Sequence, residues 1–186
     1  MNFAAELWIP IVVSAVLVFV ASSVIHMVLK YHNSEFRRLA DEDAVRAAIR
    51  AVNPVPGQYV LPHCGDMKDM QTPAMQQKFR EGPVALLTVR ASGAPAMGKS
   101  LAMWFVFTLV IGVIAAYVAS RTLPAAATFG QVARITGVAA LLAYGGGSVQ
   151  AGIWMGKPWS SVAKELLDAV IYAVVTGATF GWLWPH

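Results

Sequence analysis

Hydrophobic residues are gathered into four long runs along this chain, with polar segments between them. The runs cover residues 7–29, 101–119, 135–154 and 162–183. Each is close to the roughly 20 residues that an α-helix needs to cross about 30 Å of hydrocarbon, at about 1.5 Å per residue. The pattern therefore predicts four transmembrane helices, a first one that ends by residue 32 and three more at about 100–120, 132–155 and 162–184.

The one polar portion of the chain, residues 33–99, has helix and strand signals of its own. Acidic residues Asp41 to Asp43 precede the segment AVRAAIRAV, an order that favours a short amphipathic helix ending before Asn53. Thr72 and Pro73 are suited to the N-cap and first position of a second helix. The apolar stretches 58–61 and 84–89 have strand length and are expected to pair.

The expected fold class is therefore an all-α membrane protein with four transmembrane helices and a small α/β loop subdomain between the first two. The predicted domains are a first transmembrane helix over 1–32, the loop subdomain over 33–99 and a three-helix transmembrane region over 100–186. A module of this size rarely builds a sufficient core alone. The membrane surface or another copy is expected to support it.

Composition agrees with a membrane protein and predicts little catalytic chemistry. Of 186 residues, 57% are hydrophobic and 13% charged, against about 25% charged in an ordinary soluble domain. The single cysteine, Cys64, excludes an intramolecular disulfide. No nucleophile with a base, and no carboxylate pair, can be assembled from sequence spacing. An enzyme is therefore not favoured, and no cofactor is expected.

The distribution of positive charge predicts the orientation in the membrane. Twelve of the fourteen Lys and Arg residues lie within 30–99 or 157–164, and only Arg121 and Arg134 lie elsewhere. Because cytoplasmic loops carry the excess of Lys and Arg, residues 33–99 are expected in the cytoplasm and both termini in the periplasm.

Residues 93–100, GAPAMGKS, match the phosphate-binding pattern G-x-x-x-x-G-K-[ST]. That loop needs a parallel sheet and a soluble helix behind it, whereas the helix that follows here is a predicted membrane span. We expect Gly98, Lys99 and Ser100 to begin that helix at the cytoplasmic face, with a lipid phosphate as a possible contact. No nucleotide is expected to bind.

The last hydrophobic run carries polar side chains on one helical face: Glu165, Asp168, Tyr172 and Thr176. Ionisable groups in a membrane span are functional candidates. Asp168 lies about one turn inside the cytoplasmic boundary, where Lys164, Arg90 or Lys99 could reach it, and Gln150 is a further partner. The pattern favours an ion pair or hydrogen-bonded tether, and the alternative is a proton or ion path.

The segment from His63 to Met70 offers imidazole, thiolate and carboxylate groups, of which His63, Cys64 and Asp66 are candidate metal ligands. The spacing matches no metal-binding template, so a polar turn is favoured over a metal site. His26 and His32 are six residues apart, which on a straight helix places them on different faces.

Small residues recur every four positions in the predicted spans, an arrangement that lets helices approach closely in lipid. They are Gly112, Ala116 and Ser120; Ala139, Ala143 and Gly147; and Gly177 and Gly181. They predict tight packing within the chain or, alternatively, an oligomer. The triplet 145–147, three adjacent glycines, suggests a close helix crossing or a local unwinding.

The stretches GPVALLTVRASGAPAMGKSLAMWF and GATFGWLWP resemble those of a group of bacterial four-span membrane proteins with no assigned activity. The resemblance covers most of the chain from the end of the first span. It implies a bacterial inner-membrane protein of the same architecture and no particular catalytic or binding residue.

The sequence thus favours an accessory or interaction role in the inner membrane, in a homo-oligomer or a membrane-protein complex. Membrane lipids are expected partners, and nucleic acid is not. The first alternative is a small ion or solute transporter or channel that uses the glycine triplet and the Asp168 face. The second is a metal-handling protein built around His63 and Cys64.

Overall fold

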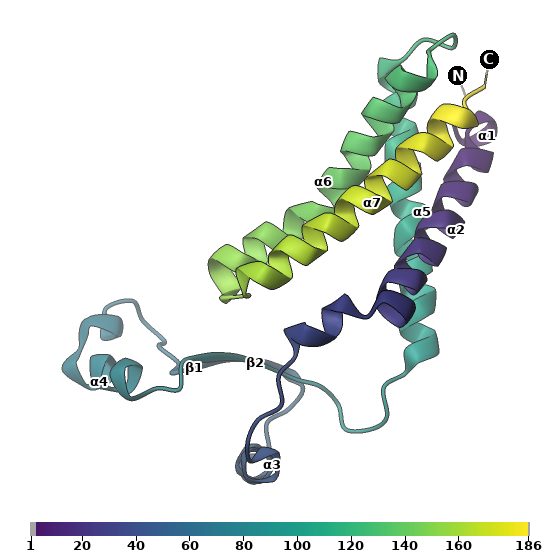
Figure 1. The fold of residues 1–186 in the computed structure, drawn as a ribbon. Coiled ribbons are helices and arrows are strands. Elements are labelled where there is room, and N and C mark those ends of the chain that lie inside the picture. Colours follow the sequence, from purple (N-terminus) through teal and green to yellow (C-terminus); the bar gives the residue numbers. More distant parts are fainter. Residues whose placement is uncertain (1–2, 186) are drawn as a thin grey trace. The chain divides into compact units, whose positions relative to one another are not determined.

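The computed structural model describes residues 3–185 of the chain, which are mostly helical (Figure 1). It divides into two compact units. The larger unit comprises the residues up to Phe36 together with those from Ala96 onward, and the smaller one comprises Arg37–Pro95.

Each of the four hydrophobic runs forms a long helix in the larger unit. The helical elements are α1 (Phe3–Glu6), α2 (Trp8–Ser23), the π-helical turn η1 (Val24–Leu29) that continues α2, the 3-10 turn η2 (Tyr31–Glu35), α5 (Met97–Thr122), α6 (Phe129–Met155) and α7 (Trp159–Trp182). Three stretches are long and apolar enough to cross a membrane: Trp8–Leu29, Met97–Thr122 and Phe129–Met155. α7 has the length of a span but carries Lys164, Glu165 and Asp168 in its first turns.

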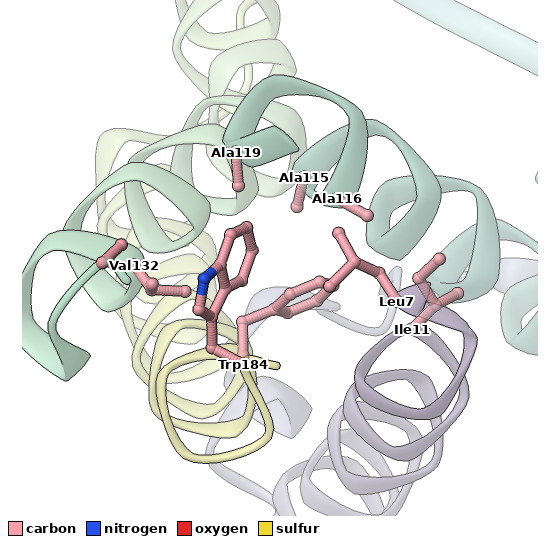
Figure 2. Packing of buried hydrophobic residues seen from close by; sticks show 9 residues of the cluster. Leu7, Ile11, Ala115, Ala116, Ala119, Val132 and Trp184 are labelled. Atoms are coloured by element: carbon pink, nitrogen blue, oxygen red, sulfur yellow. The ribbon is translucent and has the colours of Figure 1, made fainter. Parts of the chain in front are cut away.

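The long helices form two pairs, α2 with α5 and α6 with α7, and α2 also contacts α7. Figure 1 shows the pairs close together near the two termini and diverging toward the other end. The terminal end holds the largest hydrophobic cluster, which Figure 2 shows between the helices. There Leu7, Ala115, Val132, Phe180 and Trp184 are at most 2% exposed. This end of the unit is closed by packing.

Glycines allow the backbones of α6 and α7 to cross closely. A Cβ atom added at Gly177 would lie 2.6 Å from the Ala133 carbonyl oxygen, and one added at Gly137 would lie 3.3 Å from that of Ala173. Gly112 of α5 similarly meets the Ile11 carbonyl oxygen, at 3.2 Å. The glycines predicted to serve close packing on α5 and α7 therefore do so within the chain.

The glycine triplet does not unwind its helix, since α6 is helical throughout Phe129–Met155. Of the two alternatives that the sequence left open, the close crossing is found, and at Gly145 alone. A Cβ atom at Gly145 would lie 3.1 Å from the Ala169 Cβ, whereas Gly146 and Gly147 have no other atom within 4 Å of such a position.

The smaller unit confirms the local predictions made from the loop sequence. It contains α3 (Glu42–Ala51), β1 (Gly57–Leu61), the 3-10 turn η3 (Asp69–Gln71), α4 (Pro73–Glu81) and β2 (Ala85–Val89). Asp41 and Thr72 cap the two α-helices by accepting hydrogen bonds from backbone N–H groups. The strands pair antiparallel, with Gly57 opposite Val89. No side chain of the unit is fully buried, as expected for so small a module.

The α6–α7 crossing yields a stability prediction. Gly177→Ala forces a Cβ atom against a backbone carbonyl, and such overpacking costs about 1–3 kcal/mol. Gly146→Ala has open space and gains about 1 kcal/mol of helix propensity. Thermal unfolding in detergent should therefore place Gly177→Ala below the wild type and Gly146→Ala at or above it. Equal midpoints for the two variants would contradict this crossing geometry.

Candidate functional site

The chain reverses direction at the end of the first long helix. The Lys30 N–H donates to the Ile25 carbonyl oxygen at 3.2 Å, and Lys30 takes a left-handed conformation with φ of 53°. The reversal brings the His32 ring onto the His26 ring, with centroids 4.6 Å apart and planes inclined by 4°. The expectation that these rings point to different faces is wrong, because the helix ends between them.

Both histidines lie beside Asp168 of α7, a carboxylate whose residue is 5% exposed. Asp168 accepts a hydrogen bond from the Tyr31 hydroxyl, and its Oδ2 lies 2.9 Å from His32 Nε2 and 3.9 Å from His26 Nε2. Burial and the bond to Asp168 raise the pKa of Tyr31, so the phenol is the donor. Glu35 Oε1 lies 2.6 Å from His32 Nδ1 and completes the group.

Lys164, one turn before Asp168 on α7, also binds the η2 segment. Its ammonium group donates to the Tyr31 carbonyl oxygen at 2.7 Å and to Ser34 Oγ at 2.6 Å, and it lies 4.0 Å from Glu35 Oε1. Side chains of α7 therefore hold η2 through both a carboxylate and an ammonium group.

A cavity of about 840 Å³ opens beside Asp168, between the two helix pairs at the end away from the termini. Its wall includes four aromatic side chains that contact one another with ring centroids 5.2 to 6.1 Å apart: Trp104, Phe107, Tyr144 and Tyr172. Polar lining groups are His26, Asp168 and the ion pair of Lys157 with Glu165. The cavity thus combines an aromatic wall with a charged end.

Two polar atoms of the aromatic wall are buried without a hydrogen bond of normal geometry within the described part of the chain. They are Trp104 Nε1 and the Tyr172 hydroxyl, the latter beside Ser22. Buried donors without partners are uncommon in folded proteins. Trp104 Nε1 is therefore a donor that the described residues leave unused, buried behind the surface of the wall, whereas the Tyr172 hydroxyl has Ser22 beside it.

The predicted polar face of the last helix points into the larger unit. Glu165, Asp168 and Tyr172 line the cavity, and Thr176 is buried at 2% exposure. Gln150 is exposed and lies outside the residues that line the cavity. Asp168 is hydrogen-bonded, as the tether interpretation expects, but to Tyr31 and His32 rather than to a lysine or arginine.

The predicted ligands of the loop do not converge. The Cys64 thiol donates to the Asp66 carbonyl oxygen at 2.9 Å, and the Asp66 carboxylate accepts from the Lys68 N–H. Among residues 3–185, the one group of three or more His, Cys, Asp or Glu side chains that could hold a metal is His26, His32 and Asp168, whose ligand atoms lie within 4.8 Å of one another. His63 is exposed and belongs to no such group.

Gly98, Lys99 and Ser100 lie in the first turns of α5, all exposed. The N-cap is Ala96, without a side-chain cap, and the Ser100 hydroxyl donates to the Ala96 carbonyl oxygen at 3.4 Å. Contact of this helix start with a lipid phosphate stays a prediction.

Sequence reasoning did not single out Tyr31 and Glu35, and it placed His32 on a different face from His26. Tyr31, His32 and Glu35 stand in the polar run YHNSE directly after the first apolar run. Because consecutive long helices run in opposite directions, the end of the first and the start of the fourth lie at the same end of the unit, near Asp168. The contact of this run with Asp168 could therefore have been predicted from the order of the helices. It was not, because the first helix was treated as straight through His32.

Comparison with known proteins adds no template for this site, since no family model, curated protein or solved structure matches the chain. The chemistry of the site is therefore inferred from its own geometry.

The contacts of Asp168 predict the behaviour of the η2 segment. Tyr31→Phe removes a hydrogen bond to a buried carboxylate, and bonds to charged groups contribute about 1.5–3 kcal/mol. Thermal unfolding in detergent and amide hydrogen exchange over 31–35 should show a lowered midpoint and faster exchange. Phe36→Ala is the control, because Phe36 in the same region is 87% exposed. Unchanged exchange in Tyr31→Phe would contradict the docking of this segment through Asp168.

Proposed function

We propose that this chain is a four-span integral protein of the bacterial inner membrane, with α7 as the fourth span. Two contacts near opposite ends of α7 support this. Lys164 in the second turn of α7 donates to the Tyr31 carbonyl oxygen just beyond the first apolar span, and Trp184 Nε1 donates to the Ala125 carbonyl oxygen in the loop between α5 and α6 at 3.1 Å. The 24 residues of α7 extend about 36 Å, enough to cross a bilayer.

The proposed orientation has residues 37–95 in the cytoplasm and both termini in the periplasm. Arg121 and Arg134 are the only lysines or arginines outside the segments 30–99 and 157–164, and the charge asymmetry between loops is what sets orientation. The charged end of the cavity then belongs to the cytoplasmic half of the membrane.

The proposed function is an accessory one, in which the protein binds an amphiphilic small molecule in the cavity. The observation that carries this proposal is the cavity itself, whose volume is that of a ligand pocket. The aromatic wall suits an apolar body. Trp104 Nε1 is buried, so it donates to an acceptor on the head once neighbouring side chains shift to admit the ligand. A long-chain quinone and the carbonyl region of a phospholipid share this chemistry.

The packing of the terminal end argues against an ion path through a single copy. Leu7, Phe180 and Trp184 are at most 2% exposed there, and Figure 2 shows the cluster between the helices. A binding role needs no opening at that end. Association with a second copy or with another membrane protein remains part of the proposed accessory role.

The proposed topology is testable with the single native cysteine. A membrane-impermeant maleimide should fail to label Cys64 in intact cells and should label it after permeabilisation. In a Cys64→Ser background, Ala126→Cys in the α5–α6 loop and Trp182→Cys at the end of α7 should react in intact cells, since both positions are exposed. If Trp182→Cys behaves like Cys64 while Ala126→Cys reacts from outside, α7 does not cross and the four-span proposal is wrong.

Ligand binding is testable by native mass spectrometry of the detergent-solubilised protein with a long-chain quinone and, separately, with phosphatidylethanolamine. Trp104→Phe keeps an aromatic ring and removes the N–H donor. It should weaken binding about 2- to 10-fold, corresponding to about 0.5–1.5 kcal/mol for one hydrogen bond. Trp182→Phe is the matched control because Trp182 is 83% exposed. Binding of neither compound, or equal effects of the two variants, would contradict the proposal.

A further inference from the structure

We propose that His26, His32 and Asp168 form a binding site for a divalent first-row transition-metal ion. Two imidazole nitrogens and a carboxylate are ligands that zinc and iron accept. With metal–ligand distances of about 2.0–2.2 Å, ligand atoms of a tetrahedral site lie about 3.3 Å apart. The distances from Asp168 Oδ2 to the two Nε2 atoms, 2.9 and 3.9 Å, bracket that value.

The hydrogen bond of its other ring nitrogen fixes His26 in the tautomer that binds metal through Nε2. His26 Nδ1 lies 3.0 Å from the Ser22 carbonyl oxygen, which can only accept, so this nitrogen carries the proton. His32 Nδ1 likewise donates to the Glu35 carboxylate. His32 Nε2 is hydrogen-bonded to Asp168 at 2.9 Å, so a metal ion at this nitrogen replaces that bond. The two rings are stacked in parallel, so one of them must turn before both Nε2 lone pairs reach the same ion.

These outer partners are of the kind that metal-bound histidines have. The non-ligating N–H of such a histidine is usually bonded to a carboxylate or a backbone carbonyl oxygen, here those of Glu35 and Ser22. The Tyr31 hydroxyl similarly holds Asp168. Each of the three proposed ligands is therefore oriented by a group that is not itself a ligand.

The charge around the group also suits a cation. The group contains three carboxylates and two ammonium groups. The carboxylates are those of Glu35, Glu165 and Asp168, and the ammonium groups are those of Lys157 and Lys164. With neutral histidines the excess is one negative charge. Without a cation between them, the His26 Nε2 lone pair and the Asp168 Oδ2 atom are two acceptors 3.9 Å apart.

The site has room for a further ligand on the metal. His26 and Asp168 line the cavity, and the His26 side chain is 48% exposed. Three protein ligands leave at least one coordination position free, as in zinc sites that act on a bound molecule. The His26 ring has to rotate out of its parallel stack with His32 for its nitrogen to reach the metal, and its exposure leaves it room to do so. The free position then faces the cavity.

The test uses full-length protein without added histidine residues, purified in detergent, stripped with chelator and titrated with Co²⁺ and Zn²⁺. One equivalent of Co²⁺ should bind with visible absorption bands of low coordination number, and azide should shift them through the free position. His26→Ala should weaken binding by at least about 100-fold. Glu35→Gln, which alters only an outer partner, should weaken it about 10-fold.

His63→Ala is the control, because His63 is exposed in the other unit and its loss should change nothing. His26→Ala removes a half-exposed ring, so its folding is checked by thermal unfolding in chelator. Binding that survives His26→Ala, binding lost in His63→Ala, or no binding above nonspecific background would each overturn the metal site. The amphiphile experiment is performed without metal, so the two proposals fail separately.

Discussion

The structure depends on the placement of one buried carboxylate. Asp168 is buried on α7, where an ionised carboxylate without hydrogen bonds would be strongly destabilising. Tyr31 and His32 supply those bonds from the far side of a chain reversal. The need to satisfy Asp168 thus determines where the first long helix stops, how η2 folds back and why two histidines come into contact. The aromatic cavity beside it is bounded by the same groups.

The larger unit has one end closed by packing and one end that holds a cavity. Near the termini, Phe180 and Trp184 fill the space between helices, and Gly177 lets α6 and α7 approach to backbone contact. Such contacts fix the crossing because helices in lipid associate through close packing. Toward the other end the helix pairs diverge, and aromatic and charged side chains border open space. The closed end therefore allows the open end to hold a cavity without loss of the fold.

Most of the fold could be predicted from the sequence because it follows from local rules. Apolar run lengths predicted the four long helices, while Asp41 and Thr72 marked the starts of the helices in the loop unit. The site could not be predicted in the same way, because it depends on a helix end. A 3.6-residue period places His26 and His32 apart, and only the left-handed turn at Lys30 reverses that result. Asp168 was recognisable as an ionisable residue in an apolar run, but its partners are 136 and 137 residues away.

The conformation of Lys30 has an energetic consequence for the segment that follows it. A non-glycine residue at φ of 53° carries a conformational penalty of about 1–2 kcal/mol, which the contacts of Tyr31, His32 and Ser34 with α7 must outweigh. Each of those contacts that is lost lowers the stability of the docked segment, so the left-handed turn makes residues 31–35 more sensitive to a single substitution than an unstrained turn would be.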